Sequence, residues 1–145
     1  MTVLARALVV LMALHMAIGI KLTADTVIAC RKSGVSYYKE NKLFWARRIS
    51  GFAIFVFMIL HLAVFMGKTG GNVRLKYFGV FELLGQILLV ISVAVHVITN
   101  VKPMMISFGI KSLKEYSIDI LVVLSVLMLF AGAAFLIYYL RWNYF

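Results

Sequence analysis

Four long apolar runs constrain this chain more than any other feature of its sequence. They cover about residues 3–22, 49–66, 80–101 and 118–140. A helix needs roughly 20 mostly apolar residues to cross a bilayer, so each run is long enough to span one. Because 64% of the 145 residues are hydrophobic and only 14% are charged, lipid must cover part of the apolar surface. We predict an all-α integral membrane protein, a single membrane domain over 1–145 with four transmembrane helices.

Charge and cysteine content exclude several other classes of protein. The net charge of +10 does not indicate nucleic-acid binding, because the Lys and Arg residues stand at the ends of apolar runs, as in membrane proteins. The single cysteine, Cys30, excludes an internal disulfide and an iron–sulfur cluster held by this chain alone. The first run also resembles a signal peptide, but Lys21 and Asp25 separate it from Cys30, and we expect a retained helix.

The distribution of basic residues predicts the topology. Ten of the fifteen Lys and Arg residues lie in two segments, 21–48 and 102–114. Since cytoplasmic loops carry the excess of positive charge, we expect the loop 23–48 in the cytoplasm and both termini outside. No Asp or Glu lies in the middle of a predicted span, which disfavours proton-coupled transport.

All three histidines fall inside predicted spans: His15 in the first, His61 in the second and His96 in the third. Ionisable residues inside a membrane are costly and usually functional, although a neutral imidazole can also join neighbouring helices by a hydrogen bond. Neutral imidazole is a common axial ligand of haem iron, and helix bundles hold such cofactors. We therefore predict a haem-binding bundle in which these histidines are the candidate ligands.

Depth in the membrane decides which histidines can share one iron. His15 and His96 each lie about 9 Å from the basic residue that ends their span on the cytoplasmic side, whereas His61 lies about 20 Å from the basic start of its span. On this arithmetic His15 and His96 can share a haem, whereas His61 and His96 cannot. If His61 is a ligand, its partner belongs to a second haem site or to another subunit.

Two stretches carry a resemblance to a known family. The segment 47–51 (RRISG), which precedes an apolar run, resembles the Arg-x-Ser-Gly start of the first helix in cytochrome b subunits of succinate dehydrogenases and fumarate reductases. The segment 96–109 resembles the family's His-x-x-x-Gly-Ile-Arg-His-x-x-x-Asp-Phe-Gly motif, without a gap. The resemblance covers about residues 44–141, and the helix with His15 is additional to the three-helix members.

The resemblance implies roles for individual residues. His96 matches the family's haem b ligand, and His61 matches a histidine that di-haem members carry. Lys102 stands where the family has an arginine near the haem propionates, and Arg47 is our second candidate for the propionates. The chain departs from the motif at three further positions: Asn100, Pro103 and Ser107 replace the family's glycine, histidine and aspartate.

Three residues at the predicted cytoplasmic interface are our candidates for quinone binding. Ser50 can donate a hydrogen bond to a quinone carbonyl, Arg48 brings a positive charge, and Trp45 packs at the mouth of the pocket. A structural alternative is that Arg48 is an ordinary interfacial anchor and that Ser50 permits close helix packing. Phe44 stands where three-helix members have a serine of the quinone pocket.

In this family, a flavoprotein subunit interconverts succinate and fumarate, an iron–sulfur subunit relays electrons, and the membrane anchor exchanges them with quinone. The resemblance implies that this chain is the anchor in a bacterial-type cytoplasmic membrane, with one or two haem b groups. It would not act on succinate itself. Because the number of histidines is odd, we expect either that a partner, such as a second small membrane subunit, supplies at least one haem ligand, or that one histidine is not a ligand. Two alternatives stay open: a free-standing b-type cytochrome that serves another dehydrogenase, and a haem-free structural subunit whose histidines bridge helices.

Overall fold

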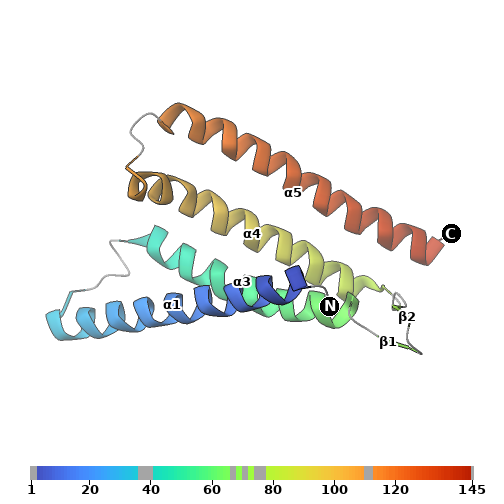
Figure 1. The fold of residues 1–145 in the computed structure, drawn as a ribbon, viewed down its shortest axis with the longest axis horizontal. Coiled ribbons are helices and arrows are strands. Elements are labelled where there is room, and N and C mark those ends of the chain that lie inside the picture. Colours follow the sequence, from blue (N-terminus) through green and yellow to red (C-terminus); the bar gives the residue numbers. More distant parts are fainter. Residues whose placement is uncertain are drawn as a thin grey trace.

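The computed structural model describes residues 3–35, 41–65, 68–69, 72–73, 78–109 and 113–144. Its long helices are α1 (Val3–Ser33), α3 (Lys42–Phe65), α4 (Val80–Ser107) and α5 (Leu113–Tyr144). Between α3 and α4, the short strands β1 (Lys68–Thr69) and β2 (Asn72–Val73) pair in antiparallel fashion. Successive helices run in opposite directions, so the chain passes back and forth along one axis (Figure 1).

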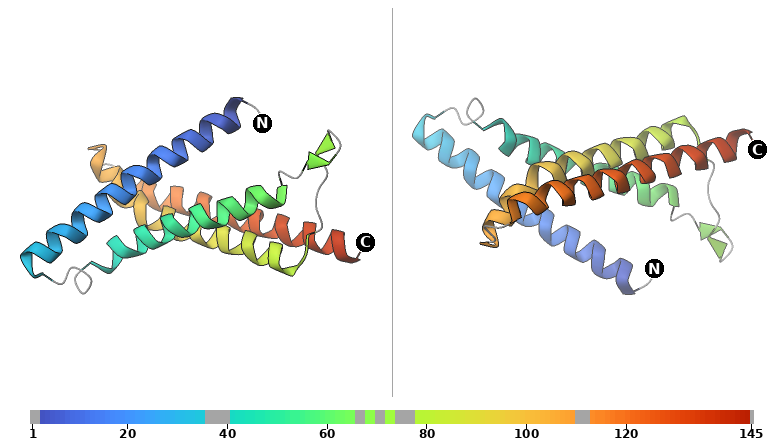
Figure 2. Two further views of the ribbon diagram at one scale, coloured as in Figure 1. Left: turned by 90° about the horizontal axis from the view of Figure 1, so that it is seen from below. Right: turned by 90° about the horizontal axis from the view of Figure 1, so that it is seen from above.

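The central helix is α4, which packs against α3 on one side and against α5 on the other. The remaining helix, α1, makes fewer contacts and packs mainly against α3. It crosses the other helices at an angle, and its N-terminal half points away from them (Figure 2). This oblique crossing leaves a space between α1 and α3, where the candidate site lies.

The helices are long and apolar enough to cross a membrane. They contain 31, 24, 28 and 32 residues, which corresponds to about 36 to 48 Å against a hydrocarbon core of about 30 Å. Among the described residues, the buried large apolar side chains are few: Phe78, Leu89, Val101 and Met105. Most apolar side chains of the described residues face outward. The predicted all-α architecture, with four helices that could span a membrane, is confirmed, whereas haem binding by the bundle stays a prediction.

The predicted cytoplasmic loop 23–48 is wrong in its bounds, because α1 continues to Ser33 and α3 already begins at Lys42. Hydropathy detects the part of a helix that lies in hydrocarbon, not the point where the helix ends. The hydroxyl of Thr23 donates to the Gly19 carbonyl over 2.6 Å, a bond that polar residues make without leaving a helix. Local signals mark both ends of the connection between α1 and α3. Gly34, at φ +68°, follows the last residue of α1. The Asn41 side chain accepts the Phe44 N–H at the start of α3.

The third predicted span also ends too early, because α4 continues through Pro103 to Ser107. Proline has no N–H, so the carbonyl four residues earlier, that of Thr99, loses its helical donor. In this structure the Nε–H of Arg47 on α3 donates to that carbonyl over 2.8 Å. A neighbouring helix thus supplies the bond that the proline removes, which is how membrane helices tolerate proline.

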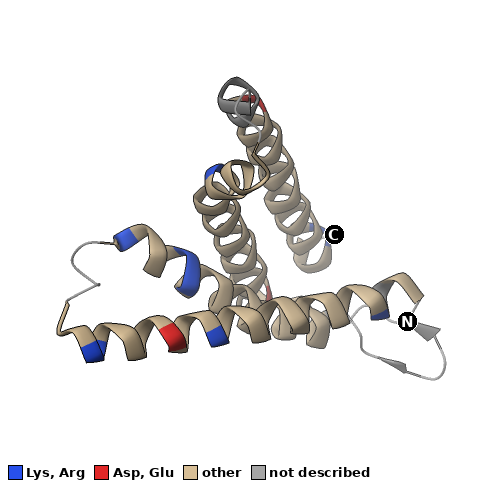
Figure 3. Ribbon diagram, turned by 60° about the vertical axis from the view of Figure 1, so that its left-hand side comes forward, with Lys and Arg blue, Asp and Glu red and all other residues tan. Residues whose placement is uncertain are grey.

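The N-terminal end of α4 and the C-terminal end of α5 are joined by a polar contact and an aromatic contact. Asn143 donates through Nδ2 to the Phe78 carbonyl over 2.9 Å, and the fully buried Phe78 ring meets the Tyr138 ring edge-on at 5.0 Å. The carboxylate of Glu82 accepts the Gly79 N–H at the start of α4. At the opposite end, basic segments gather where α1 ends and α3 begins (Figure 3).

We predict that Arg47 and Pro103 are energetically coupled. Arg47→Met should lower the free energy of unfolding by about 1–3 kcal/mol, because it leaves the Thr99 carbonyl without a charged donor. The same substitution should cost less in a Pro103→Ala background, where a backbone N–H can reach that carbonyl. Unfolding of the four proteins in mixed detergent micelles, followed by circular dichroism, measures the cycle. Strictly additive effects would contradict the compensation.

Candidate functional site

His15 of α1 and His96 of α4 meet inside the membrane. Their ring centroids are 6.2 Å apart and the ring planes are nearly perpendicular, at 84°. The structure thus brings together the two histidines whose predicted depths match, and their role as ligands stays a prediction. The two rings come from helices that lie on either side of α3 in the sequence, and α1 brings His15 to the site by its oblique crossing (Figure 2).

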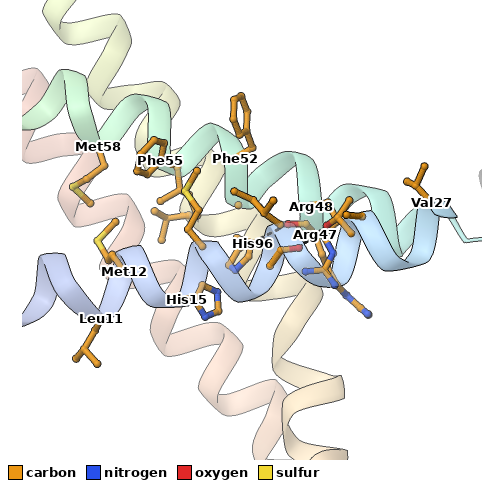
Figure 4. Close-up of a pocket in the computed structure, with 18 of the residues that line it drawn as sticks. Leu11, Met12, His15, Val27, Arg47, Arg48, Phe52, Phe55, Met58 and His96 are labelled. Atoms are coloured by element: carbon orange, nitrogen blue, oxygen red, sulfur yellow. Dashed lines mark hydrogen bonds between the residues drawn. The ribbon is translucent and has the colours of Figure 1, made fainter. Parts of the chain in front are cut away.

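Both histidines line a cavity of about 870 Å³ between α1 and α3. The cavity wall is mostly apolar. Met12, Phe55 and Met58 lie at the end of the cavity away from Arg47 and Arg48 (Figure 4). Pockets for small molecules and cofactors typically have volumes of about 300–1,000 Å³ and mainly apolar linings with few polar groups. Besides the histidines, the cavity wall includes Gly51 and three arginines, Arg31, Arg47 and Arg48.

One turn of α3 holds the His96 ring. The Nδ1 atom of His96 lies 3.2 Å from the Arg47 carbonyl oxygen and 3.2 Å from the Ser50 hydroxyl. A carbonyl oxygen can only accept, so the contact with Arg47 requires a proton on Nδ1 and leaves the lone pair on Nε2. A Cβ at Gly51 would lie 3.2 Å from Cε1 of His96, so the glycine allows α3 to approach the ring.

The basic end of the cavity carries three guanidinium groups, those of Arg31, Arg47 and Arg48. Within the part of the chain that the structure describes, no acidic residue lines the cavity. The guanidinium of Arg48 lies over the Phe44 ring, 4.8 Å from its centroid. Its Nε atom is buried and has no hydrogen-bond partner among the described residues. A buried donor of this kind, next to apolar walls, favours an anionic group as its partner.

The sequence analysis did not identify Arg31 as a site residue, although the spacing of residues along α1 indicates it. Every fourth residue of α1 from Leu11 to Arg31 lines the cavity, and His15 belongs to this row. Such rows form ridges along a helix, so a cation in the same row as an intramembrane histidine is a candidate for the same site.

The other predicted site residues lie outside the cavity wall. Lys102 is exposed on α4, and Trp45 is half-buried with its ring edge-on to Phe44 at 5.4 Å. Ser50 is buried, with 6% of its surface exposed, and its hydroxyl faces Arg47 and His96. Of the predicted quinone contacts, only Arg48 lines the cavity, and the quinone role of all three stays a prediction.

His61 lies in a different environment from the other two histidines. Its Nδ1 atom is 2.6 Å from Oε1 of Gln86 on α4, and its ring is 6.2 Å from the Phe135 ring on α5. Gln86 is fully buried, and sequence reasoning missed it although it is the one glutamine in the chain and lies within a predicted span. The structure therefore brings His15 and His96 together and separates His61 from them.

Comparisons with models of known families, with curated proteins and with solved structures find no match to this chain. The resemblance to cytochrome b subunits therefore rests on the two sequence motifs. The geometry of the cavity between α1 and α3 is an independent basis for a function.

We predict that the Gln86 amide sets the tautomer of His61. Because Oε1 of Gln86 accepts, His61 should carry its proton on Nδ1, which nitrogen NMR of ¹⁵N-histidine-labelled protein can detect. Gln86→Leu should shift His61 toward a mixture of tautomers and lower the free energy of unfolding by about 1–3 kcal/mol. An unchanged His61 spectrum in this variant would contradict the role of the amide, and the signals of His15 serve as the internal control.

Proposed function

We propose that this chain is a haem b-binding electron-transfer subunit in a membrane, with His15 and His96 as the axial ligands of one haem. The observation that carries the proposal is the 6.2 Å between their ring centroids. Two imidazoles that shared one metal ion would have ring centres about 6 Å apart, since each metal–nitrogen bond is about 2 Å and each ring centre lies about 1 Å behind its nitrogen.

The residues of the cavity fit a haem group in two further respects. An apolar wall suits the porphyrin face and keeps water from the iron, and the volume of about 870 Å³ lies in the range of cofactor pockets. Haem also carries two propionates, for which Arg31, Arg47 and Arg48 are the nearest cations of the cavity wall. Arginine binds carboxylates through paired N–H groups, and the unpartnered Nε of Arg48 is an available donor.

When bound, haem supplies one-electron transfer, and the protein supplies its ligands, charge and shielding from water. His15 would also have a structural role, because α1 packs mainly against α3 and makes few other contacts. An iron shared by His15 and His96 would tie α1 to α4. We therefore expect haem to stabilise the position of α1, since a ligand that binds only the folded arrangement stabilises it.

The resemblance to cytochrome b subunits supports a more specific proposal. In it, the chain is the membrane anchor of a succinate:quinone oxidoreductase and passes electrons between an iron–sulfur subunit and quinone, while a flavoprotein subunit acts on succinate or fumarate. The basic end of the helices, with Arg48 and Trp45, faces the cytoplasm of a bacterial-type cell and the soluble subunits, and the termini face outward. Quinone reacts at this end of the bundle.

The haem proposal predicts different effects for the three histidines. Detergent-purified protein should give a b-type reduced-minus-oxidised spectrum with one haem per chain by pyridine haemochrome. His15→Ala and His96→Ala should lose at least nine-tenths of the haem, because each removes an axial ligand. His61→Ala is the matched control and should keep its haem, because His61 lies against Gln86 and Phe135.

Absence of haem from the wild-type protein would overturn the proposal and leave a structural membrane subunit. Loss of haem in His61→Ala alone would move the site to α3, α4 and α5. Haem without co-purifying flavoprotein and iron–sulfur subunits would overturn the more specific proposal and indicate a cytochrome that serves another dehydrogenase.

Two variants distinguish the charge of the cavity wall, carried by Arg48, from the propionate position that the sequence motif implies, Lys102. Arg48→Gln should weaken haem binding by about tenfold or more, because it removes a guanidinium from the cavity wall. Lys102→Gln should change haem affinity little, because Lys102 is exposed outside that wall. Haem titration of the two variants measures the contrast. A larger effect at Lys102 would support the propionate role that the family motif implies and contradict the role of Arg48.

A further inference from the structure

The turn of α3 formed by residues 47–51 contacts the His96 ring through three different groups. The Arg47 carbonyl oxygen and the Ser50 hydroxyl both lie 3.2 Å from Nδ1. Gly51 has no side chain and therefore leaves room for Cε1 of the ring. Ser50 is one of the few buried polar residues among those described, with 6% of its surface exposed. A hydroxyl in that position faces an imidazole rather than lipid or the cavity.

The hydrogen bonds of Ser50 have one consistent arrangement. Its hydroxyl donates to the Arg47 carbonyl over 3.1 Å, so its own lone pairs face Nδ1 of His96. The Nδ1–H group of His96 then meets two acceptors, the Ser50 hydroxyl and the Arg47 carbonyl. This arrangement stabilises a single tautomer, with the proton on Nδ1 and the lone pair on Nε2.

We propose that Ser50 is a positioning residue for His96: its hydroxyl holds the ring in the Nδ1-protonated tautomer and directs Nε2 toward the iron. The inference rests on the proposed haem site and assigns Ser50 a role different from the quinone contact that the sequence predicts. Hydrogen bonds to the distal nitrogen of a ligating histidine orient the ring and raise its basicity. A more basic ligand favours the oxidised iron, so Ser50 lowers the midpoint potential of the haem.

The test compares three variants of the purified protein. Ser50→Ala removes one of the two acceptors of the His96 Nδ1–H group and should weaken haem binding about tenfold. This is the lower end of the effect on metal affinity when a hydrogen-bond partner of a metal ligand is removed. Its midpoint potential should move to a more positive value. Ser50→Thr keeps the hydroxyl and should restore both properties. Ser125→Ala is the matched control, because Ser125 also bonds to a carbonyl of its own helix, on α5, and does not contact His96.

A second measurement does not depend on haem. Nitrogen NMR of ¹⁵N-histidine-labelled protein prepared without haem should show His96 with its proton on Nδ1. In Ser50→Ala only the Arg47 carbonyl still accepts from Nδ1, so the fraction of the other tautomer should increase. Unchanged His96 signals together with an unchanged midpoint potential would overturn the role of Ser50. If the wild-type protein binds no haem, the haem proposal fails, whereas the NMR comparison still decides whether Ser50 controls the His96 tautomer.

Gly51 offers an additional variant on the same turn. Gly51→Ala places a methyl group 3.2 Å from Cε1 and 3.5 Å from Nδ1 of His96, so the ring must move by a few tenths of an ångström. The variant should therefore change the midpoint potential and the haem spectrum while leaving the Ser50 hydroxyl in place. A spectrum and potential identical to those of the wild type would contradict the close support of His96 by this turn.

Discussion

Hydrocarbon offers no hydrogen bonds, so every polar group inside the four helices needs a partner within the protein. The specific contacts between α3 and α4 follow from this constraint. The Thr99 carbonyl receives the Arg47 side chain, the His96 ring lies against the Arg47 carbonyl, and the His61 ring lies against Gln86. The groups that lipid penalises most are thus the groups that fix how these two helices face each other.

These contacts give the two sides of α3 different chemical characters. Toward α1, His96 and His15 meet in a cavity that has cations at one end. Toward α4 and α5, His61 is enclosed by an amide and an aromatic ring. The three intramembrane histidines therefore form one pair and one separate residue, and the pair is the arrangement that a single haem needs.

Much of the fold follows from hydropathy, and part of the site follows from depth. The four spans were recognisable because lipid requires about 20 apolar residues in a row. The approach of His15 to His96 followed from counting residues to the basic ends of their helices. The helix ends did not follow, because hydropathy reports the hydrocarbon boundary, and the continuation of α4 through Pro103 depends on a donor from another helix.

The sequence by itself determined that four helices are long and apolar enough to cross a membrane, and which end of the bundle is basic. Only the tertiary structure decided how each helix is rotated about its axis. Lipid is as apolar as a packed interface, so a membrane helix carries little hydrophobic asymmetry to indicate its inner face. For that reason neither the orientation of Ser50 toward His96 nor the contact of Gln86 with His61 had a clear signal in the sequence.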